Sequence, residues 1–173
     1  MSADRRVIAI HHAHPRLRFA KREVESAIAV LDAHAGKFLG GCPAGELSIA
    51  FLTDPALAKI HADFMDDPTA TDVITFEGNR GMAQAGEICV SVDTAARFVG
   101  LLPAKKSTKP PQKTDAAIAK FSAELTLYVV HGWLHLAGYD DLQPAKKRRM
   151  RAAEKRAMTL LGSAKAVPSF RLI

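Results

Sequence analysis

The stretch of sequence that decides the fold is LTLYVVHGWLHLAG, residues 125–138. Together with the more polar residues before it, this stretch predicts one long helix over residues 115–137. A helix that is apolar around almost its whole circumference is covered by other elements, so we expect it at the centre of the domain. Gly138 is its natural end, because glycine readily adopts the left-handed conformation found after helix C-termini.

In the rest of the chain, short β-branched runs alternate with amphipathic segments. Strands are expected over residues 7–12, 47–52, 72–76 and 87–92, and helices over residues 18–35, 53–64, 93–99 and from 144 onward. A glycine-rich turn separates the last two strands, so we expect them to pair in antiparallel fashion. Asp93 is placed to cap the helix that follows it. The order of elements predicts a single α+β domain over residues 1–173, with a small mixed β-sheet covered by helices and the long helix buried at its centre.

Length and composition exclude several classes of protein. The chain has 173 residues, 48% of them hydrophobic, which excludes both a disulfide-stapled mini-protein and a disordered chain. No run reaches the roughly eighteen apolar residues of a membrane span, and the N-terminal segment lacks the pattern of a signal peptide. We therefore expect a soluble, cytoplasmic protein. Cys42 and Cys89 form no CxxC pair and are expected as free, partly buried thiols.

The net charge of +6 is unevenly distributed along the chain. Residues 103–156 contain twelve basic and five acidic residues, whereas the remainder contains twelve basic and thirteen acidic ones. A basic half favours a polyanionic partner, although charge alone leaves open a merely solvated face and the choice among RNA, DNA and an acidic membrane. Four cations, residues 146–149, begin the last predicted helix, where they oppose the helix macrodipole. Helix stability therefore does not explain them.

The segment HGWLHLAGYDD, residues 131–141, has the spacing of a metal site. His131 and His135 are four residues apart and project from the same face of a helix, so two imidazoles can converge on one ion. Gly138 can turn the chain back so that Asp141 supplies a third ligand. Two nitrogen donors and one oxygen donor leave an open position for water, as in catalytic zinc sites.

Other interpretations of these residues stay open. Two histidines in an apolar helix can be core residues, Asp141 can cap the helix that begins at Pro144, and Asp140 can replace Asp141 as a ligand. Glu124 lies on nearly the same helical face and can orient an imidazole, although an exposed or differently paired glutamate is the simpler interpretation. The three histidines of HHAHP, residues 11–15, are expected in an exposed turn.

The same histidine and glycine spacing resembles that of the metzincin proteases. In those enzymes a glutamate that acts as general base follows the first histidine, and here that position is Gly132. Glycine cannot accept a proton, so a metallopeptidase would need a base from elsewhere in the chain. Peptidase activity is therefore the less favoured function.

HGWLHLAGYDD also resembles the HGxLHLxGYDH motif of the YbeY family of ribosomal RNA maturation endoribonucleases. Two further segments resemble family motifs in the same order: TDVITF, residues 71–76, is similar to TDVLSF, and GEICVSVDTA, residues 86–95, to GDIxISxDTA. The resemblance implies an α+β metalloprotein in which Zn²⁺, held by His131, His135 and the third-ligand position, supports hydrolysis of RNA phosphodiester bonds. It also implies a role in small-subunit rRNA processing and ribosome quality control, with ribosomal RNA and the small ribosomal subunit or its precursors as partners.

Two positions depart from the pattern of this family. Asp141 stands where the family has its third histidine, and the added negative charge predicts weaker activation of water or a shift toward a harder metal such as Mn²⁺. Met65 stands six residues before Thr71, where the family carries an arginine important for RNA cleavage, and methionine cannot bind a phosphate. Another arginine could take over phosphate binding only if the fold brings it near the metal. The candidates are Arg16, Arg18 and Arg80.

Two functions are therefore favoured over a metallopeptidase. The favoured one is a metal-dependent endoribonuclease with His131, His135 and Asp141 as metal ligands. The alternative is a metal-containing, RNA-binding ribosome assembly factor that does not cleave, which Met65 favours. In both cases we expect RNA phosphates to bind the cations of the loop before the long helix and of the start of the last helix. These cations are Lys105, Lys106, Lys146, Lys147, Arg148 and Arg149.

Overall fold

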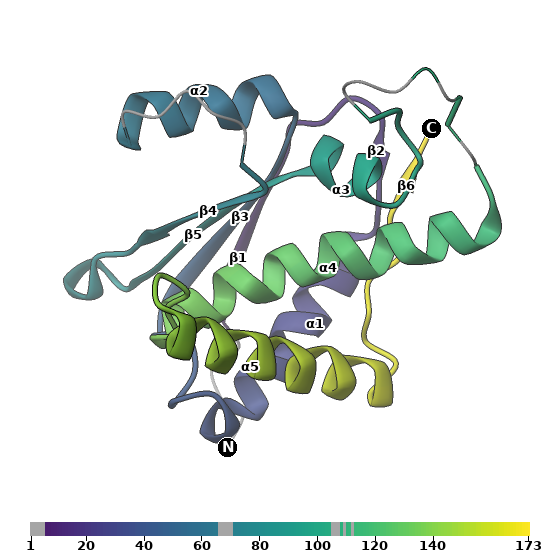
Figure 1. Cartoon of the computed structure of the whole chain (residues 1–173). Coiled ribbons are helices and arrows are strands. Elements are labelled where there is room, and N and C mark those ends of the chain that lie inside the picture. Colours follow the sequence, from purple (N-terminus) through teal and green to yellow (C-terminus); the bar gives the residue numbers. More distant parts are fainter. Residues whose placement is uncertain (1–5, 66–70, 105–107, 109, 112) are drawn as a thin grey trace.

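The computed structural model describes residues 6–65, 71–104, 108, 110–111 and 113–173, and Figure 1 shows the arrangement of its elements. The helices are α1 (Lys21–Ala33), α2 (Asp54–Met65), α3 (Val92–Phe98), α4 (Asp115–Ala137) and α5 (Pro144–Ser163). The strands are β1 (Ile8–His12), β2 (Leu17–Arg18), β3 (Glu46–Leu52), β4 (Val73–Glu77), β5 (Gln84–Ser91) and β6 (Arg171–Leu172). Two short 3₁₀ helices are η1 (Ala35–Lys37) and η2 (Arg80–Met82).

The main sheet is mixed, with the strand order β1-β3-β5-β4. β1, β3 and β5 run parallel, and β4 lies at the edge antiparallel to β5. The predicted α+β fold with a small mixed sheet is confirmed, as is the antiparallel pairing of the last two predicted strands. The first helix begins at Lys21 rather than at residue 18, because Leu17 and Arg18 pair with the distant strand β6 in a second, two-stranded sheet.

The two faces of the main sheet bury different side chains, because alternate residues of a strand point to opposite sides. On one face, Leu47, Ile49 and Phe51 belong to a large core shared with α1, α4 and α5. On the other face, Ala50 and Leu52 belong to a smaller core beneath α2. Figure 1 shows α2 over one face of the sheet and α1, α4 and α5 on the side of the opposite face.

α4 lies against the sheet at the centre of the large core, with the predicted bounds. Its Trp133 is fully buried, and the Trp133 Nε1–H donates to Asp32 of α1 at 3.1 Å. Gly132 faces β5, where a Cβ would lie 2.4 Å from Cγ2 of Ile88. The missing side chain lets the helix approach the sheet closely and fixes its rotation. The flanking residue His131 is thereby turned to the side of the helix, where it is half-buried.

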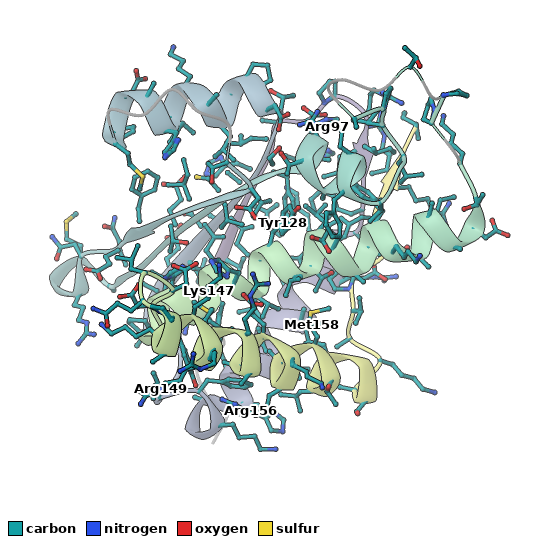
Figure 2. The ribbon with its side chains drawn as sticks, in the orientation of Figure 1. Arg97, Tyr128, Lys147, Arg149, Arg156 and Met158 are labelled. Atoms are coloured by element: carbon teal, nitrogen blue, oxygen red, sulfur yellow. The ribbon has the colours of Figure 1, made fainter. Side chains whose placement is uncertain are left out.

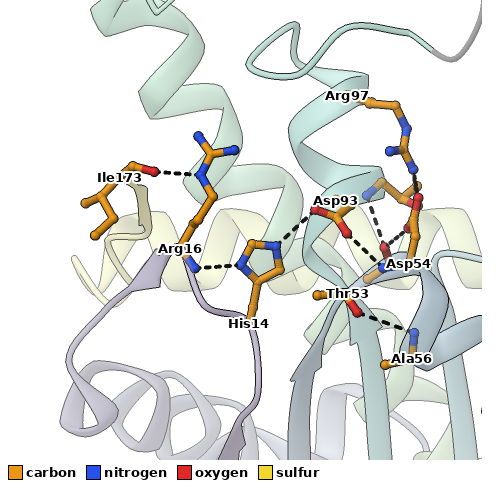
Figure 3. A network of polar contacts seen from close by, with 10 residues as sticks. His14, Arg16, Thr53, Asp54, Ala56, Asp93, Arg97 and Ile173 are labelled. Carbon is orange, nitrogen blue, oxygen red and sulfur yellow. Dashed lines mark hydrogen bonds and ion pairs between the residues drawn. The ribbon is translucent and has the colours of Figure 1, made fainter.

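A network of polar contacts fastens α2 and α3 to the ends of the parallel strands (Figure 3). Asp54, the first residue of α2, accepts hydrogen bonds from the hydroxyls of Ser91 and Thr94 and from the Arg97 guanidinium. Asp93 accepts from the Asp54 N–H at 2.8 Å. Because the partners of Asp54 come from the end of β5 and from α3, the network joins the start of α2 to both elements.

Two expectations for this region are wrong. The cap of α3 is Ser91, whose hydroxyl accepts from the Thr94 N–H at 3.0 Å, whereas Asp93 is turned toward the start of α2. His14 is not in an exposed turn but 5% exposed, with Nε2 3.0 Å from Asp93 and Nδ1 accepting from the Arg16 N–H. His11 and His12 are exposed, as expected, but they are the last two residues of β1 and do not lie in a turn.

Candidate metal centre

His131 and His135 lie one turn apart near the C-terminal end of α4. Their Nε2 atoms are 3.0 Å apart, and the rings meet edge to face with centroids separated by 4.5 Å. The two side chains are 22% and 28% exposed, so solvent or a substrate can reach them. The predicted convergence of two imidazoles on one point is therefore present in the fold.

Asp141 joins the histidines through the turn that follows α4. Gly138 has a φ of 114°, and its N–H donates to the carbonyl of His135, so the chain reverses where the sequence predicts it. Oδ2 of Asp141 lies 3.6 Å from His131 Nε2, and Oδ1 lies 3.7 Å from His135 Nε2. The turn at Gly138 thus places the Asp141 carboxylate next to the two imidazoles.

Asp140, the alternative ligand, is turned away from the histidines. Its Oδ1 accepts from the Leu142 N–H at 3.0 Å, and its Oδ2 lies 3.5 Å from Lys146 Nζ. The Leu142 hydrogen bond first and the nearby ammonium to a lesser degree hold the pKa of Asp140 below its ordinary value. The structure brings Asp141, and not Asp140, to the two imidazoles.

The three donor groups have the spacing that one metal ion requires. Ligand atoms about 2.0–2.2 Å from a tetrahedral ion lie roughly 3.3–3.6 Å from one another. The three side chains offer ligand atoms that all lie within 4.8 Å of one another, with pairwise distances of 3.0, 3.6 and 3.7 Å between the nearest atoms. Two imidazole nitrogens and one carboxylate oxygen fit a divalent cation such as zinc and leave a coordination position open.

Glu154 of α5 acts on this site through His131. Its Oε1 accepts a hydrogen bond from His131 Nδ1 at 2.7 Å, and the carboxylate side chain is 12% exposed. With the proton on Nδ1, the Nε2 lone pair of His131 faces the other donors. Sequence reasoning missed Glu154, which follows His131 by 23 positions. The one available signal was a glutamate inside the apolar stripe of α5, whose buried members are Met150, Ala153, Glu154, Ala157 and Leu161.

Glu124 does not orient an imidazole. It hydrogen-bonds to Tyr128, one turn further along α4, so the interpretation as a differently paired glutamate is confirmed. Burial raises the pKa of Glu124, and burial together with the nearby Glu124 charge raises that of Tyr128. Glu124 is therefore paired with Tyr128 along α4 and is not part of the candidate ligand set.

The pKa of His135 is lowered, first by burial and then by the neighbouring His131 imidazole. Asp141 and a hydrogen bond to the backbone of Tyr139 oppose this effect without cancelling it. A lowered pKa favours the neutral form of the imidazole, and this is the form that binds a metal.

Comparison with known proteins identifies the family. The family model described as Endoribonuclease YbeY matches residues 10–162 of the chain. The chain belongs to the YbeY endoribonuclease family. One relative, Endoribonuclease YbeY of Chlamydia muridarum, is 36% identical over 127 residues, which cover 70% of each chain. Endoribonuclease YbeY of Porphyromonas gingivalis (strain W83) is 29% identical over 147 residues, or 85% of this chain and 83% of the relative.

The fold also matches a solved structure. The solution structure of TM1509 from Thermotoga maritima superposes with a TM-score of 0.54 at 22% identity, covering 94% of this chain and 95% of that one. At this identity the likeness concerns the fold alone. The YbeY assignment therefore rests on the family model and the sequence relatives, and the α+β architecture agrees with it.

At the position of the YbeY arginine, Met65 ends α2 and is 49% exposed. Two of the arginines considered as replacements are engaged elsewhere. Arg16 Nε donates to the Ile173 carbonyl, and Arg18 donates to the carbonyl of Pro15. Arg80 lies in η2, between β4 and β5, and no described hydrogen bond links its side chain to the metal-site residues. None of the three is brought to the ligands by a contact within the described ranges.

The six predicted RNA-binding cations of this YbeY member fall into different places. Lys105 and Lys106 lie outside the described residues. Lys146 faces Asp140. Figure 2 shows Lys147 and Arg149 on opposite sides of α5, and Arg148 is exposed. The predicted patch at the start of α5 is therefore divided between two flanks of the helix.

Within the described ranges, no helix has the length and apolar character needed to cross a bilayer.

Proposed function

We propose that this chain is a metal-dependent endoribonuclease acting in the maturation of ribosomal RNA. The observation that carries the proposal is the convergence of His131 Nε2, His135 Nε2 and the Asp141 carboxylate, with separations of 3.0 to 3.7 Å, in a member of the YbeY family. Its relatives bear the name Endoribonuclease YbeY. Ribosomal RNA and the small ribosomal subunit or its precursors are the substrates and partners that this function entails.

His131, His135 and Asp141 are the residues that would hold the metal ion. Zn²⁺ suits two imidazoles and a carboxylate, and the carboxylate also admits a harder ion such as Mn²⁺. A bound divalent ion supplies Lewis-acid polarisation of a phosphoryl oxygen and activation of water. Glu154 keeps the His131 proton on Nδ1, so that Nε2 stays available as a ligand.

Cations on α5 bind the RNA through its phosphates. Such contacts give an affinity that falls as the salt concentration rises and carry little base specificity. α5 has no aromatic residue, so stacking on bases does not contribute along this helix.

The test measures the metal content per chain and RNA cleavage on the same samples. Wild-type protein is expected to hold about one ion per chain, as the three-ligand set requires, and to cleave a ribosomal RNA fragment. His135→Ala is expected to lose both the ion and the cleavage. His11→Ala, which removes an exposed imidazole from β1, should change neither and is the matched control. Retention of the ion by His135→Ala would contradict the assigned ligands.

Met65 favours a second candidate function, a metal-containing RNA-binding assembly factor that does not cleave. A thioether can neither bind a phosphate bidentately nor stabilise charge developing on phosphorus. A bound ion with RNA binding but no cleavage by wild-type protein would decide for this candidate. Cleavage that is lost in His135→Ala, with the variant's circular dichroism unchanged, would exclude it.

A further inference from the structure

Three cations form a row along one side of α5: Lys147, Arg151 and Lys155, here called the α5 row. Successive members are four residues apart, so they lie about 6 Å apart along the helix axis and on neighbouring turns of the same side. All three side chains are exposed. The row thus presents a line of positive charge rather than a diffuse patch.

The hydrogen bond between Glu154 and His131 locates this row relative to the candidate metal centre. Around the helix axis, Lys147 and Arg151 lie about 20° and 60° from Glu154, whereas Arg149 lies about 140° away on the other side. Figure 2 shows Lys147 on one side of α5 and Arg149 with Arg156 on the opposite side. The Lys147 and Arg151 end of the row therefore borders the metal centre.

Contacts within the protein do not account for the α5 row. None of its three side chains has an ion-pair partner within the described ranges, and the members repel one another as like charges four residues apart. Lys147 also stands in the first turn of the helix, where a cation opposes the macrodipole. By contrast, Arg156 on the opposite side donates to the Lys37 carbonyl and the Tyr139 hydroxyl. The row lowers helix stability, which points to an external anion as its partner.

We infer that the α5 row binds consecutive phosphates of an RNA strand and leads that strand past the metal centre, with Arg151 as the guanidinium nearest the ligands. This inference rests on the proposed function for the nature of the anion. A guanidinium binds a phosphate bidentately, which Met65 cannot do, so Arg151 provides from α5 the phosphate contact that α2 lacks. Lys147 and Lys155 extend the contact in both directions along the strand.

The α5 row differs from the four cations, residues 146–149, that the sequence predicted to bind RNA. The row contains Lys147 from that set and adds Arg151 and Lys155. Arg149 lies on the side of α5 that is turned away from the metal centre. Arg151→Ala and Arg149→Ala remove the same charge from the same helix, two positions apart. Comparing RNA binding by the two variants therefore separates the effect of a cation's position on α5 from the effect of losing one positive charge.

The experiment is a fluorescence anisotropy titration of a labelled, unstructured twelve-nucleotide RNA with wild type, Arg151→Ala, Arg149→Ala and Arg151→Lys. It is run on metal-loaded and on chelator-treated protein, with RNA integrity checked on a gel. Arg151→Ala is expected to weaken binding roughly fivefold and to reduce the slope of log Kd against log salt by about 0.7, the value of one phosphate contact on a single strand. Arg149→Ala should weaken binding less than about twofold, and Arg151→Lys should recover part of the loss.

Equal losses in Arg151→Ala and Arg149→Ala would overturn the inference, because α5 would then act as an undirected charged patch. Competition by polyglutamate as effective as that by RNA of equal charge would also overturn it, in favour of an acidic protein partner. Circular dichroism of each variant excludes misfolding as the cause. Since the binding readout does not need cleavage, a protein that binds through the row without cleaving would refute the proposed nuclease activity and leave the inference standing.

Discussion

Glu154 contacts the candidate metal centre through His131 without belonging to the proposed ligand set. Its carboxylate is largely buried and contacts His131 Nδ1 at 2.7 Å, which fixes both the tautomer and the orientation of that ring. Without this acceptor, the proton can move to Nε2 and remove the lone pair from the site. Partners of this kind typically affect metal affinity by about 10–100-fold.

We therefore expect Glu154→Ala to lower the affinity for Zn²⁺ by about 10–100-fold, and Glu154→Gln to lower it less, because the amide oxygen can still accept from Nδ1. Competition with a chromophoric chelator measures the affinity. Glu124→Ala is the control, since Glu124 hydrogen-bonds to Tyr128 and not to a histidine. An unchanged affinity in Glu154→Ala would show that the ring is oriented without it.

The metal-site residues differ in how far sequence could predict them. His131, His135 and Asp141 lie within one helix and the turn after it, where local periodicity and Gly138 determine the geometry. Glu154 meets His131 only because α5 packs against α4, and no local rule places residues of two helices side by side. Tertiary packing is therefore the part of the site that the sequence pattern could not supply.

At the scale of elements, Asp54 joins two helices to the sheet. Its carboxylate is 15% exposed and accepts from Ser91, Thr94 and the Arg97 guanidinium, all at the end of β5 or in α3. Removing it leaves three donors without their acceptor in a partly buried place. Leaving such donors without an acceptor lowers the free energy of unfolding by about 1–3 kcal/mol when they cannot all reach water.

Asp54→Ala is accordingly expected to lower the free energy of unfolding by about 2 kcal/mol. Urea denaturation followed by circular dichroism measures the change. Asp63→Ala, an exposed position on the same helix, should alter stability by no more than about 0.5 kcal/mol. A similar loss in both variants would mean that α2 is sensitive to any substitution and that the network has no particular role.

The elements themselves were predicted best where the signals are local. α4 has the expected bounds because its apolar run and the glycine that ends it, Gly138, lie within or directly beside its own segment. α1 begins later than expected because Leu17 and Arg18 pair with a strand more than 150 residues away. Ser91 and Asp93 are both residue types that favour N-caps. Ser91 caps α3, whereas Asp93 accepts from the Asp54 N–H because α2 begins beside it, and the sequence alone does not reveal that position.

At the scale of the whole molecule, the sheet separates two cores, and each contains one cysteine. Cys42 belongs to the large core with α1, α4 and α5, and Cys89 to the smaller core beneath α2. Burial raises the pKa of Cys42 to about 11, and burial with the nearby Glu87 raises that of Cys89 to about 12. Thiolate is the reactive form, so at pH 8 roughly one thiol in a thousand or fewer is reactive in the folded chain.

The two thiols therefore report separately on the two faces of the sheet. If residues 1–173 form one cooperative domain, a single unfolding transition exposes both cores and returns both thiols to a pKa near 8.5. Pulse labelling with iodoacetamide across a urea series at pH 8 should then modify Cys42 and Cys89 with the same urea midpoint. Mass spectrometry of the two peptides gives each midpoint, and circular dichroism gives that of the helices. Labelling of Cys89 at a lower urea concentration than Cys42 would contradict a single domain, since α2 would then open its face of the sheet while α1, α4 and α5 still cover the other.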